Sequence, residues 1–418
     1  MKFSPSAIST LTCLSLVSTL HAATITNPSF ETDTNYTTFP GYQSANNGGV
    51  LTGWTSSNAT RTGINADPSI FIPAASSPFA NNGTIPNGTQ VGFIQANGGP
   101  TSLSTTIADL IPGQTYRVLV DINARLSGGG TFGAQRPIGT ATIAGASSTF
   151  ALSPVLGTNP YRTLAIVFTA TAAAETLSLT NDTSVDTTLL VDNVRVSPGS
   201  TKWAAGAWTG DADSGVSSTL SYTHAFSLGS ANNAVINGIS FTGIAGGNPA
   251  LAGSFSTAGF NSTTGDALNN LAPGSGSASM GTNFVFGGAT NPQTVQTLTL
   301  EGLAVGQAYT LTMFGVGWDD ANANLAVQAA RDTGRAATFD DGNGDLLTMR
   351  EQLFGVDNGV KFHFDYVATS GSKTFSFTPT DAESTLHLYG FSNAVVPEPG
   401  SLSVLALAAF GLGLRRRR

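Results

Sequence analysis

Two segments of this chain repeat one another, and this duplication limits the fold more than any other feature of the sequence. Residues 90–116 align without gaps with residues 283–309, and both segments end in a Leu-x-x-Gly-Gln-x-Tyr motif. Further along, Thr176–Thr180 (TLSLT) matches Thr374–Thr378 (TFSFT) in the same order. One such match alone would be unremarkable, but two matches in the same order predict two copies of one domain.

The boundary between the copies is expected at Ser197–Ser200, where a Pro-Gly pair favours a turn. We therefore predict a first domain over residues 23–198 and a second over residues 201–394. A chain of 418 residues is long enough for two or three domains.

The segments within each copy are short, alternate in polarity and are separated by Gly, Asn, Asp and Pro. In Lys361–Val367, for example, Phe362, Phe364 and Tyr366 alternate with polar residues, which is typical of a strand with one buried face. We predict an all-β fold of two tandem jelly-roll-like β-sandwich domains. The best helical candidate, Asn322–Ala330, is short.

Composition favours an exported protein. Charged residues make up 10% of the chain, against roughly 25% in typical soluble domains. Gly is abundant at 49 residues, which suits tight turns. The net charge of −8 argues against nucleic acid as a partner, because phosphate binding needs clustered Lys and Arg.

The N-terminus is predicted to be a secretory signal peptide over residues 1–22. Lys2 supplies a positive start, an apolar stretch follows, and Leu20-His21-Ala22 offers a small-residue cleavage site. The only cysteine, Cys13, lies inside this peptide, so the mature chain is expected to contain no disulfide and no cysteine-bound metal.

The C-terminus has three parts. Pro397-Glu398-Pro399 is followed by an apolar run over residues 401–414 and then by Arg415-Arg416-Arg417-Arg418. Arginines beside an apolar segment hold that end on the cytoplasmic face. About 14 helical residues reach roughly 20 Å, against a hydrocarbon core of about 30 Å, so this short transmembrane segment suits a transient anchor. A buried C-terminal helix is the alternative.

This tail, residues 395–418, resembles the PEP-CTERM sorting signal of Gram-negative bacteria. The resemblance implies recognition of Pro397, Glu398 and Pro399 by an exosortase-type protease-transpeptidase, with removal of the apolar run and the arginines. It also implies an inner-membrane intermediate and delivery to the cell surface or to an extracellular polysaccharide matrix.

The edges of domain one resemble galactose-binding-like jelly rolls, which include many carbohydrate-binding modules. The resemblance rests on Asn27-Pro28-Ser29-Phe30-Glu31 at the start and Val191-Asp192-Asn193-Val194 at the end. It implies that the first and last strands are neighbours and that Glu31 and Asp192 hold a structural Ca²⁺, whose preferred ligands are oxygens. The alternative is two solvated carboxylates. Domain two has no matching Asp.

Three further features are candidates for binding. Trp54 and Trp318 could stack on sugar rings, Trp318 beside two aspartates, although tryptophan in a sandwich is more often part of the core. Asp341–Asp345 has the Asp-x-Asn-x-Asp spacing of a Ca²⁺ loop but lacks the glycine expected next, so an ordinary turn is the alternative.

The sequence gives little support for catalysis. The mature chain would keep only His224, His363 and His387, and no Gly-x-Ser-x-Gly nucleophile motif accompanies them. We expect a secreted, non-catalytic protein of the cell surface or exopolysaccharide matrix with a carbohydrate ligand. The alternatives are a purely structural matrix protein and a polysaccharide-active enzyme with paired carboxylates.

Overall fold

The computed structural model describes residues 23–33, 42–44, 51–67, 79–80, 82–125, 137–152, 160–199, 201–287, 295–317, 336–350, 354, 357–380 and 385–396. Almost all regular structure in these residues is β-strand, which confirms the predicted fold class of two tandem β-sandwiches. The alternation expected for residues 361–367 is confirmed too, because Phe362, Phe364 and Tyr366 are buried.

The first sandwich has two sheets. Its front sheet has the strand order β10-β7-β12-β5-β4-β2, and its back sheet has the order β1-β6-β11-β8-β9, with β3 also paired to β6. The strands are β1 (Thr24–Ile25), β2 (Tyr42–Ser44), β3 (Trp54–Ser56), β4 (Thr62–Ala66), β5 (Gln90–Ala96), β6 (Thr101–Ala108), β7 (Thr115–Ala124), β8 (Ile138–Ile143), β9 (Ala146–Ala151), β10 (Arg162–Thr169), β11 (Glu175–Asn181) and β12 (Thr187–Pro198).

The second sandwich has a front sheet of order β13-β25-β22-β27-β14-β16-β15 and a back sheet of order β17-β18-β21-β26-β23-β24. Its elements are β13 (Trp203–Ala207), β14 (Ser221–Leu228), β15 (Ala234–Ile236), β16 (Ile239–Ile244), β17 (Ala250–Leu251), β18 (Phe255–Ala258), β19 (Ser262–Gly265), α1 (Gly276–Met280), β20 (Asn283–Phe286), β21 (Gln296–Glu301), β22 (Ala308–Gly317), β23 (Ala336–Asp340), β24 (Leu346–Arg350), β25 (Asn358–Val367), β26 (Ser372–Pro379) and β27 (Gly390–Val395). A separate two-stranded sheet of β19 and β20, with helix α1 in the connection between its strands, accompanies these sheets, and Ser275 caps the helix by accepting a hydrogen bond from the amide of Ala278.

The repeated segments occupy equivalent places in the two sandwiches. Strand β7 lies between β10 and β12, as β22 lies between β25 and β27. Thr176 pairs with Thr106, and the matching Thr374 pairs with Thr299, so the register is also the same.

The turn before each central strand repeats in detail. Tyr116 Oη accepts a hydrogen bond of 2.9 Å from the amide of Ile111, and Tyr309 Oη accepts one of 2.9 Å from the amide of Ala304. Both tyrosines are buried, so their rings anchor the corner in the core while their hydroxyls hold the turn.

Each sandwich encloses its own apolar core. One cluster joins residues of the first sandwich between Phe30 and Val194, and another joins residues of the second between Trp203 and Phe391. The second sandwich has a further cluster, which includes Trp208, Phe241, Met280 and Phe314, and which packs α1 onto the outer face of its front sheet.

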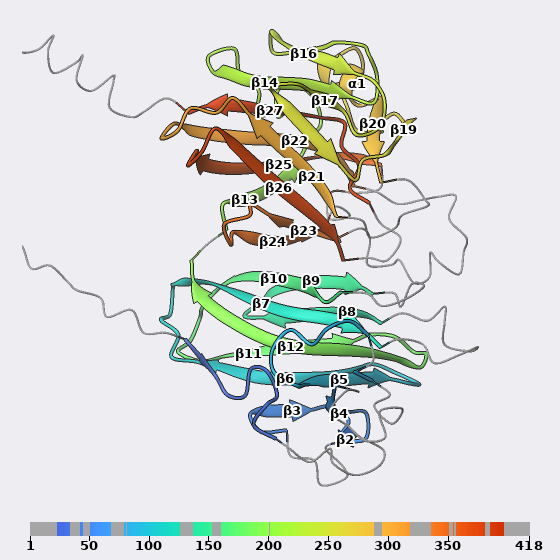
Figure 1. The fold of residues 1–418 in the computed structure, drawn as a ribbon, viewed down its shortest axis with the longest axis vertical. Helices are drawn as coiled ribbons and strands as arrows, with labels where there is room; N and C mark the ends of the chain where they lie inside the picture. Colours follow the sequence, from blue (N-terminus) through green and yellow to red (C-terminus); the bar gives the residue numbers. More distant parts are fainter. Residues whose placement is uncertain are drawn as a thin grey trace, which may run out of the picture.

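The two sandwiches stack along the long axis of the molecule, with β9 and β10 of the first next to β23 and β24 of the second (Figure 1). Strand β10 is the last strand of its sheet, and β24 is the last strand of its own. The contact between the sandwiches is therefore made largely by sheet edges.

Several predicted segments lie outside the described residues. They are the signal peptide 1–22, the helical candidate 322–330 and the sorting tail from residue 397 onward, including the predicted span 401–414. Within the described part of the chain, no helix is long and apolar enough to cross a membrane.

Candidate functional site

The outer face of the first front sheet carries a row of polar side chains. Asp121 on β7 pairs with Thr163 on β10 and with Asp192 on β12, so the three residues lie side by side across three strands. Their neighbours in sequence, such as Val120 and Val191, belong to the core. Because side chains alternate along a strand, the row points away from that core.

A β-bulge brings two more polar groups onto Asp121. The β7–β12 register shifts between Asp192 and Arg195, and Asn193 has a positive φ of 51°. Asn193 Nδ2 donates to Asp121 Oδ2 at 2.8 Å, and Arg195 Nη2 donates to Asp121 Oδ1 at 2.9 Å. Bulges commonly redirect side chains in this way beside functional sites.

The same bulge joins the two ends of the first sandwich. The amide of Val194 donates to the carbonyl oxygen of Pro28 at 2.9 Å. The opening motif and the closing motif, which are far apart in the sequence, therefore meet.

A pocket of about 520 Å³ lies over the Asp121 and Thr163 end of this row, whereas Asp192 is fully buried and does not line it. Asp121 and Thr163 line it from the sheet, Gly83, Thr84 and Pro86 line it from one loop, and Pro160 and Tyr161 line it from the segment that enters β10. It thus combines an aromatic ring, a carboxylate and hydroxyl groups, which is the chemistry expected of a site for a polar organic ligand.

Two groups at this site titrate abnormally. Burial raises the pKa of Asp192 to about 7, and the nearby charges of Asp121 and Glu31 raise it further, while the amides of Asn87 and Asn193 oppose the shift. Burial, with the charges of Asp192 and Asp67, also raises the pKa of Tyr161 well above its ordinary value. The hydroxyl of Tyr161 is buried and has no hydrogen-bond partner among the described residues.

The predicted calcium ligands contact one loop. Glu31 accepts hydrogen bonds from the amides of Thr89 and Gln90, each at 2.9 Å, and Asp192 accepts one from the amide of Asn87 at 2.8 Å. The described residues contain no cluster of three or more acidic, His or Cys side chains that could hold a metal.

The oxygens at this seam nevertheless fit a hard cation in one respect. Gln90 Oε1 is buried and has no hydrogen-bond partner among the residues that the structure describes. The amide nitrogen of the same side chain donates to the carbonyl oxygens of Phe30 and Asp33, on either side of Glu31. Ca²⁺ prefers oxygen ligands, and the seam supplies the Glu31 carboxylate and an amide oxygen, Gln90 Oε1, that has no other partner among the described residues.

Of the two tryptophans predicted to stack on sugar rings, the structure describes only Trp54. Trp54 is 7% exposed, stacks on Phe30 with ring centroids 4.8 Å apart and donates from Nε1 to the carbonyl of Asn27, so its indole packs the core. Trp318 lies outside the described residues. Trp203 and Trp208 are buried in the second sandwich.

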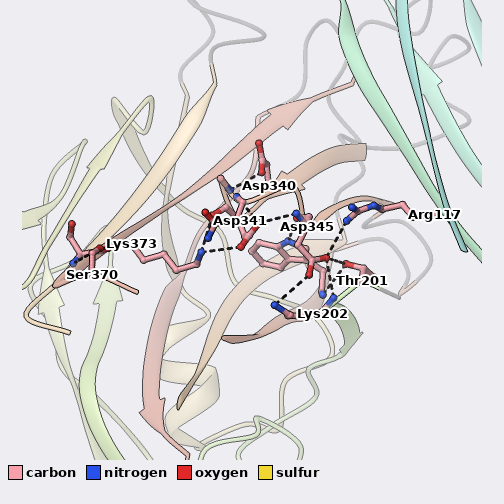
Figure 2. A network of polar contacts seen from close by, with 12 residues as sticks. Arg117, Thr201, Lys202, Asp340, Asp341, Asp345, Ser370 and Lys373 are labelled. Atoms are coloured by element: carbon pink, nitrogen blue, oxygen red, sulfur yellow. Dashed lines mark hydrogen bonds and ion pairs between the residues drawn. The ribbon is translucent and has the colours of Figure 1, made fainter. Parts of the chain in front are cut away.

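The Asp341–Asp345 loop is closed by protein groups (Figure 2). Asp341 Oδ1 accepts from the amides of Asn343 and Asp345, and Asp341 Oδ2 lies 3.0 Å from Lys373 Nζ. Asp345 Oδ1 accepts from Thr201 Oγ1 at 3.0 Å and lies 3.6 Å from Arg117 Nη1 of the first sandwich. The loop is thus a turn that contacts the first sandwich through the Arg117–Asp345 ion pair, in keeping with the ordinary turn that was the alternative interpretation of its sequence.

The face of the second sandwich that corresponds to the pocket is filled. The position of Asp121 on β7 corresponds to Phe314 on β22, which pairs with Lys361 and Gly390. Phe314 is fully buried, and its ring centroid lies 4.7 Å from that of Trp208. A Cβ added to Gly390 would lie 2.5 Å from Met280 Sδ, so this position has no room for the aspartate of the first copy.

The sequence indicated Asp192 through its resemblance but gave no signal for Asp121, Tyr161 or Thr163. Asp121 follows a run of strand residues with nothing unusual around it, and only the pairing of β7 with β10 and β12 reveals the row. The bulge at Asn193 could not be read from the sequence either, because a bulge is defined against its partner strand.

Two family matches agree with different parts of this architecture. Residues 395–418 match the PEP-CTERM protein-sorting motif, so the chain carries this sorting signal, as predicted. Residues 21–197, which span the first sandwich, match the HpiC1-like family, described as HpiC1 cyclase. No curated protein sequence matches the chain.

Structural neighbours include carbohydrate-binding modules with jelly-roll folds. TmCBM61 in complex with beta-1,4-galactotriose is 11% identical, with a TM-score of 0.26, over 41% of this chain and 96% of that module. The tandem CBM22-1-CBM22-2 domain of Paenibacillus barcinonensis Xyn10C is 10% identical, with a TM-score of 0.25, over 85% of this chain and 97% of that one. A CBM4 structure is 16% identical, with a TM-score of 0.24, over 42% and 100%. Similarity at this level does not identify a ligand.

Proposed function

We propose that this chain is an exported, non-catalytic carbohydrate-binding protein of the cell surface or extracellular polysaccharide matrix. The sorting motif supports export and processing by an exosortase-type enzyme. The ligand would occupy the pocket on the first sandwich, and the observation that carries this proposal is that the Tyr161 ring and the Asp121 carboxylate line the same pocket.

The chemistry of the pocket suits a sugar. A sugar ring presents C–H groups on its faces, which pack against an aromatic ring, and hydroxyls at its edge, which donate to carboxylates. Asp121 already accepts bonds from Thr163, Asn193 and Arg195, and a carboxylate offers about four acceptor sites, so one more donor can be accommodated. The predicted platforms Trp54 and Trp318 are not needed for this site.

A binding experiment tests the proposal. The mature protein would be incubated with insoluble or immobilised laminarin, galactan, xyloglucan, dextran and chitosan in buffer containing Ca²⁺. We expect capture by at least one of them, reduced about tenfold or more by Tyr161→Ala, because the ring contact and its buried area are lost. Tyr222→Ala, a half-buried tyrosine of the second sandwich, is the matched control.

A second variant guards against misfolding. Thr84 is exposed on the rim of the pocket, so Thr84→Trp should leave the melting temperature unchanged and block the pocket. If no polysaccharide is captured, or if both pocket variants bind as the parent does, the proposal is wrong.

A catalytic function of the same pocket is the second candidate, favoured by the match of residues 21–197 to a family described as a cyclase. Asp121 is the carboxylate that lines the pocket, and a carboxylate beside a bound ligand can exchange a proton with it. Chemical change of a captured ligand, abolished by Asp121→Asn, would favour this candidate over binding alone.

We also propose a structural Ca²⁺ at the seam of the first sandwich, held by Glu31 and Asp192 with oxygens near Gln90. Such an ion would fix the opening segment to the closing strand, and it would supply no chemistry to the pocket.

A further inference from the structure

The strand that carries one wall of the pocket lies at the edge of its sheet. Thr163 lines the pocket from β10, and Tyr161 immediately precedes that strand. Among the strands that the structure describes, β10 pairs only with β7 within its sheet. An edge strand leaves the amides and carbonyls of alternate residues without a strand partner, so its position is less constrained than that of a central strand.

Two threonines of the second sandwich form hydrogen bonds with two of these edge groups, one amide and one carbonyl. The amide of Ala165 donates to Thr348 Oγ1 at 2.9 Å, and Thr338 Oγ1 donates to the carbonyl oxygen of Thr163 at 2.9 Å. The two hydroxyls are 2.9 Å apart.

These distances fix the direction of the hydrogen bonds. A hydroxyl has one proton, and that of Thr338 is used on the carbonyl of Thr163. The proton between the two threonines must therefore come from Thr348. The result is a closed chain that leaves β10 at Ala165, passes through Thr348 and Thr338, and returns to β10 at Thr163.

The two threonines are placed rigidly for this contact. Thr338 on β23 and Thr348 on β24 are cross-strand partners in the second back sheet, and both are buried. Hydroxyls held by strand pairing lose little freedom when they bind, so the bonds to β10 are expected to be strong ones.

In the described part of the second sandwich, the position that corresponds to the pocket is filled. Phe314, Trp208 and Met280 fill the place where the first sandwich has its pocket. What the second copy contributes at the junction is therefore a fixed surface against β10.

We propose that the second sandwich is a positioning element for the pocket of the first, and that the Thr338–Thr348 pair holds β10 in the conformation that binds the ligand. The effect on ligand affinity rests on the proposed function. The constraint of β10 by the two threonines does not.

The test uses the full chain with Thr348→Val, which keeps the shape of the side chain and removes both of its hydrogen bonds. Amide hydrogen exchange of β10 and capture by the five polysaccharides named above are measured together. We expect exchange at Ala165 to accelerate about tenfold, because a buried amide loses its acceptor, and capture to fall by a similar factor. Thr348→Ser should restore both.

The matched control is Thr374→Val, which breaks a similar cross-strand pair, Thr299 with Thr374 at 2.8 Å, on an exposed part of the second sandwich. It should change neither readout. Thr338→Val, which frees the carbonyl of Thr163 and leaves the acceptor of Ala165 in place, is the second variant.

Each outcome decides a separate point. Unchanged exchange of β10 in both valine variants overturns the inference, whatever the protein binds. Faster exchange with undiminished capture overturns the positioning role and leaves the proposed function standing. Failure of the parent chain to bind any polysaccharide removes the proposed function, while the exchange result still decides whether the threonines hold β10.

Discussion

Lys373 Nζ lies 3.0 Å from Asp341 Oδ2 and 2.9 Å from the carbonyl oxygen of the same residue (Figure 2). The ammonium also lies over the rings of Phe364, Tyr366 and Phe375, between 5.2 and 5.6 Å from their centroids. The spacing of this loop suggested a metal site, but the charge of Asp341 is balanced by Lys373 of the neighbouring strand β26. The same loop carries Asp345, which contacts the first sandwich.

Replacing Asp341 by Asn should destabilise the protein by about 3 kcal/mol at pH 7, because it removes the carboxylate that balances the largely buried Lys373 charge. Burial raises the pKa of Asp341, but hydrogen bonds from Lys373, Asn343 and Asp345 and the charge of Lys373 outweigh it, so the pKa lies below its ordinary value of 3.8. The stabilisation is therefore complete above that ordinary value and is lost as the pH falls through the lowered pKa.

Urea unfolding of the parent and Asp341→Asn at several pH values measures this effect. The difference in unfolding free energy should stay constant from neutral pH down to about 5 and shrink below about 4. Asp340→Asn, at the exposed start of the same turn, is the control and should cost much less. A difference that persists unchanged in strong acid would contradict the assigned charge pair.

The hydrogen bonds that Tyr116 and Tyr309 accept from their turns should contribute equally to stability. Tyr116→Phe and Tyr309→Phe each remove the acceptor of one turn amide, at a cost of about 1 kcal/mol. In domains of this size that corresponds to a fall of about 2–4 °C in melting temperature. Tyr161→Phe is the matched control, because its hydroxyl has no partner among the described residues. Clearly unequal falls in melting temperature for Tyr116→Phe and Tyr309→Phe would argue against the equivalence of the two turns.

Calcium should raise the melting temperature of the mature protein, and a chelator should reverse the increase. At about a hundredfold excess over the dissociation constant, binding to the folded state stabilises by about 3 kcal/mol. Glu31→Gln should abolish the increase, and Mg²⁺ should not replace Ca²⁺, because Mg²⁺ demands a smaller octahedral site. Calorimetric titration that detects no binding by the parent would remove the ion from the seam.

The mass of the protein recovered from its host tests the sorting signal. We expect a C-terminus near Pro397–Pro399, with residues 401–418 removed, and an N-terminus near Ala23. Glu398→Ala should leave the tail attached, whereas Glu301→Ala, on β21, should not. A parent protein that ends at Arg418 would mean that the tail is a simple anchor.

The sequence by itself determined the strands, the duplication pattern and the sorting signal. Strands and the sorting signal are encoded in short stretches of sequence. The alternation of apolar and polar residues decides which side chains of residues 361–367 are buried. A sorting motif is recognised as a linear segment. Helix α1 was missed because five residues with little apolar periodicity carry almost no local signal.

Only the tertiary structure decided where a ligand could bind. Trp54 resembled a platform in sequence, yet its depth in the sandwich depends on Phe30 and Asn27 of another segment. The row of Thr163, Asp121 and Asp192 exists because three strands, distant in the chain, pair in one register. In the second copy, the residue at the corresponding register position, Phe314, packs against Trp208. A pattern shared in sequence therefore gives a pocket in one sandwich and a filled face in the other, because the side chains that pack over the sheet decide what space remains.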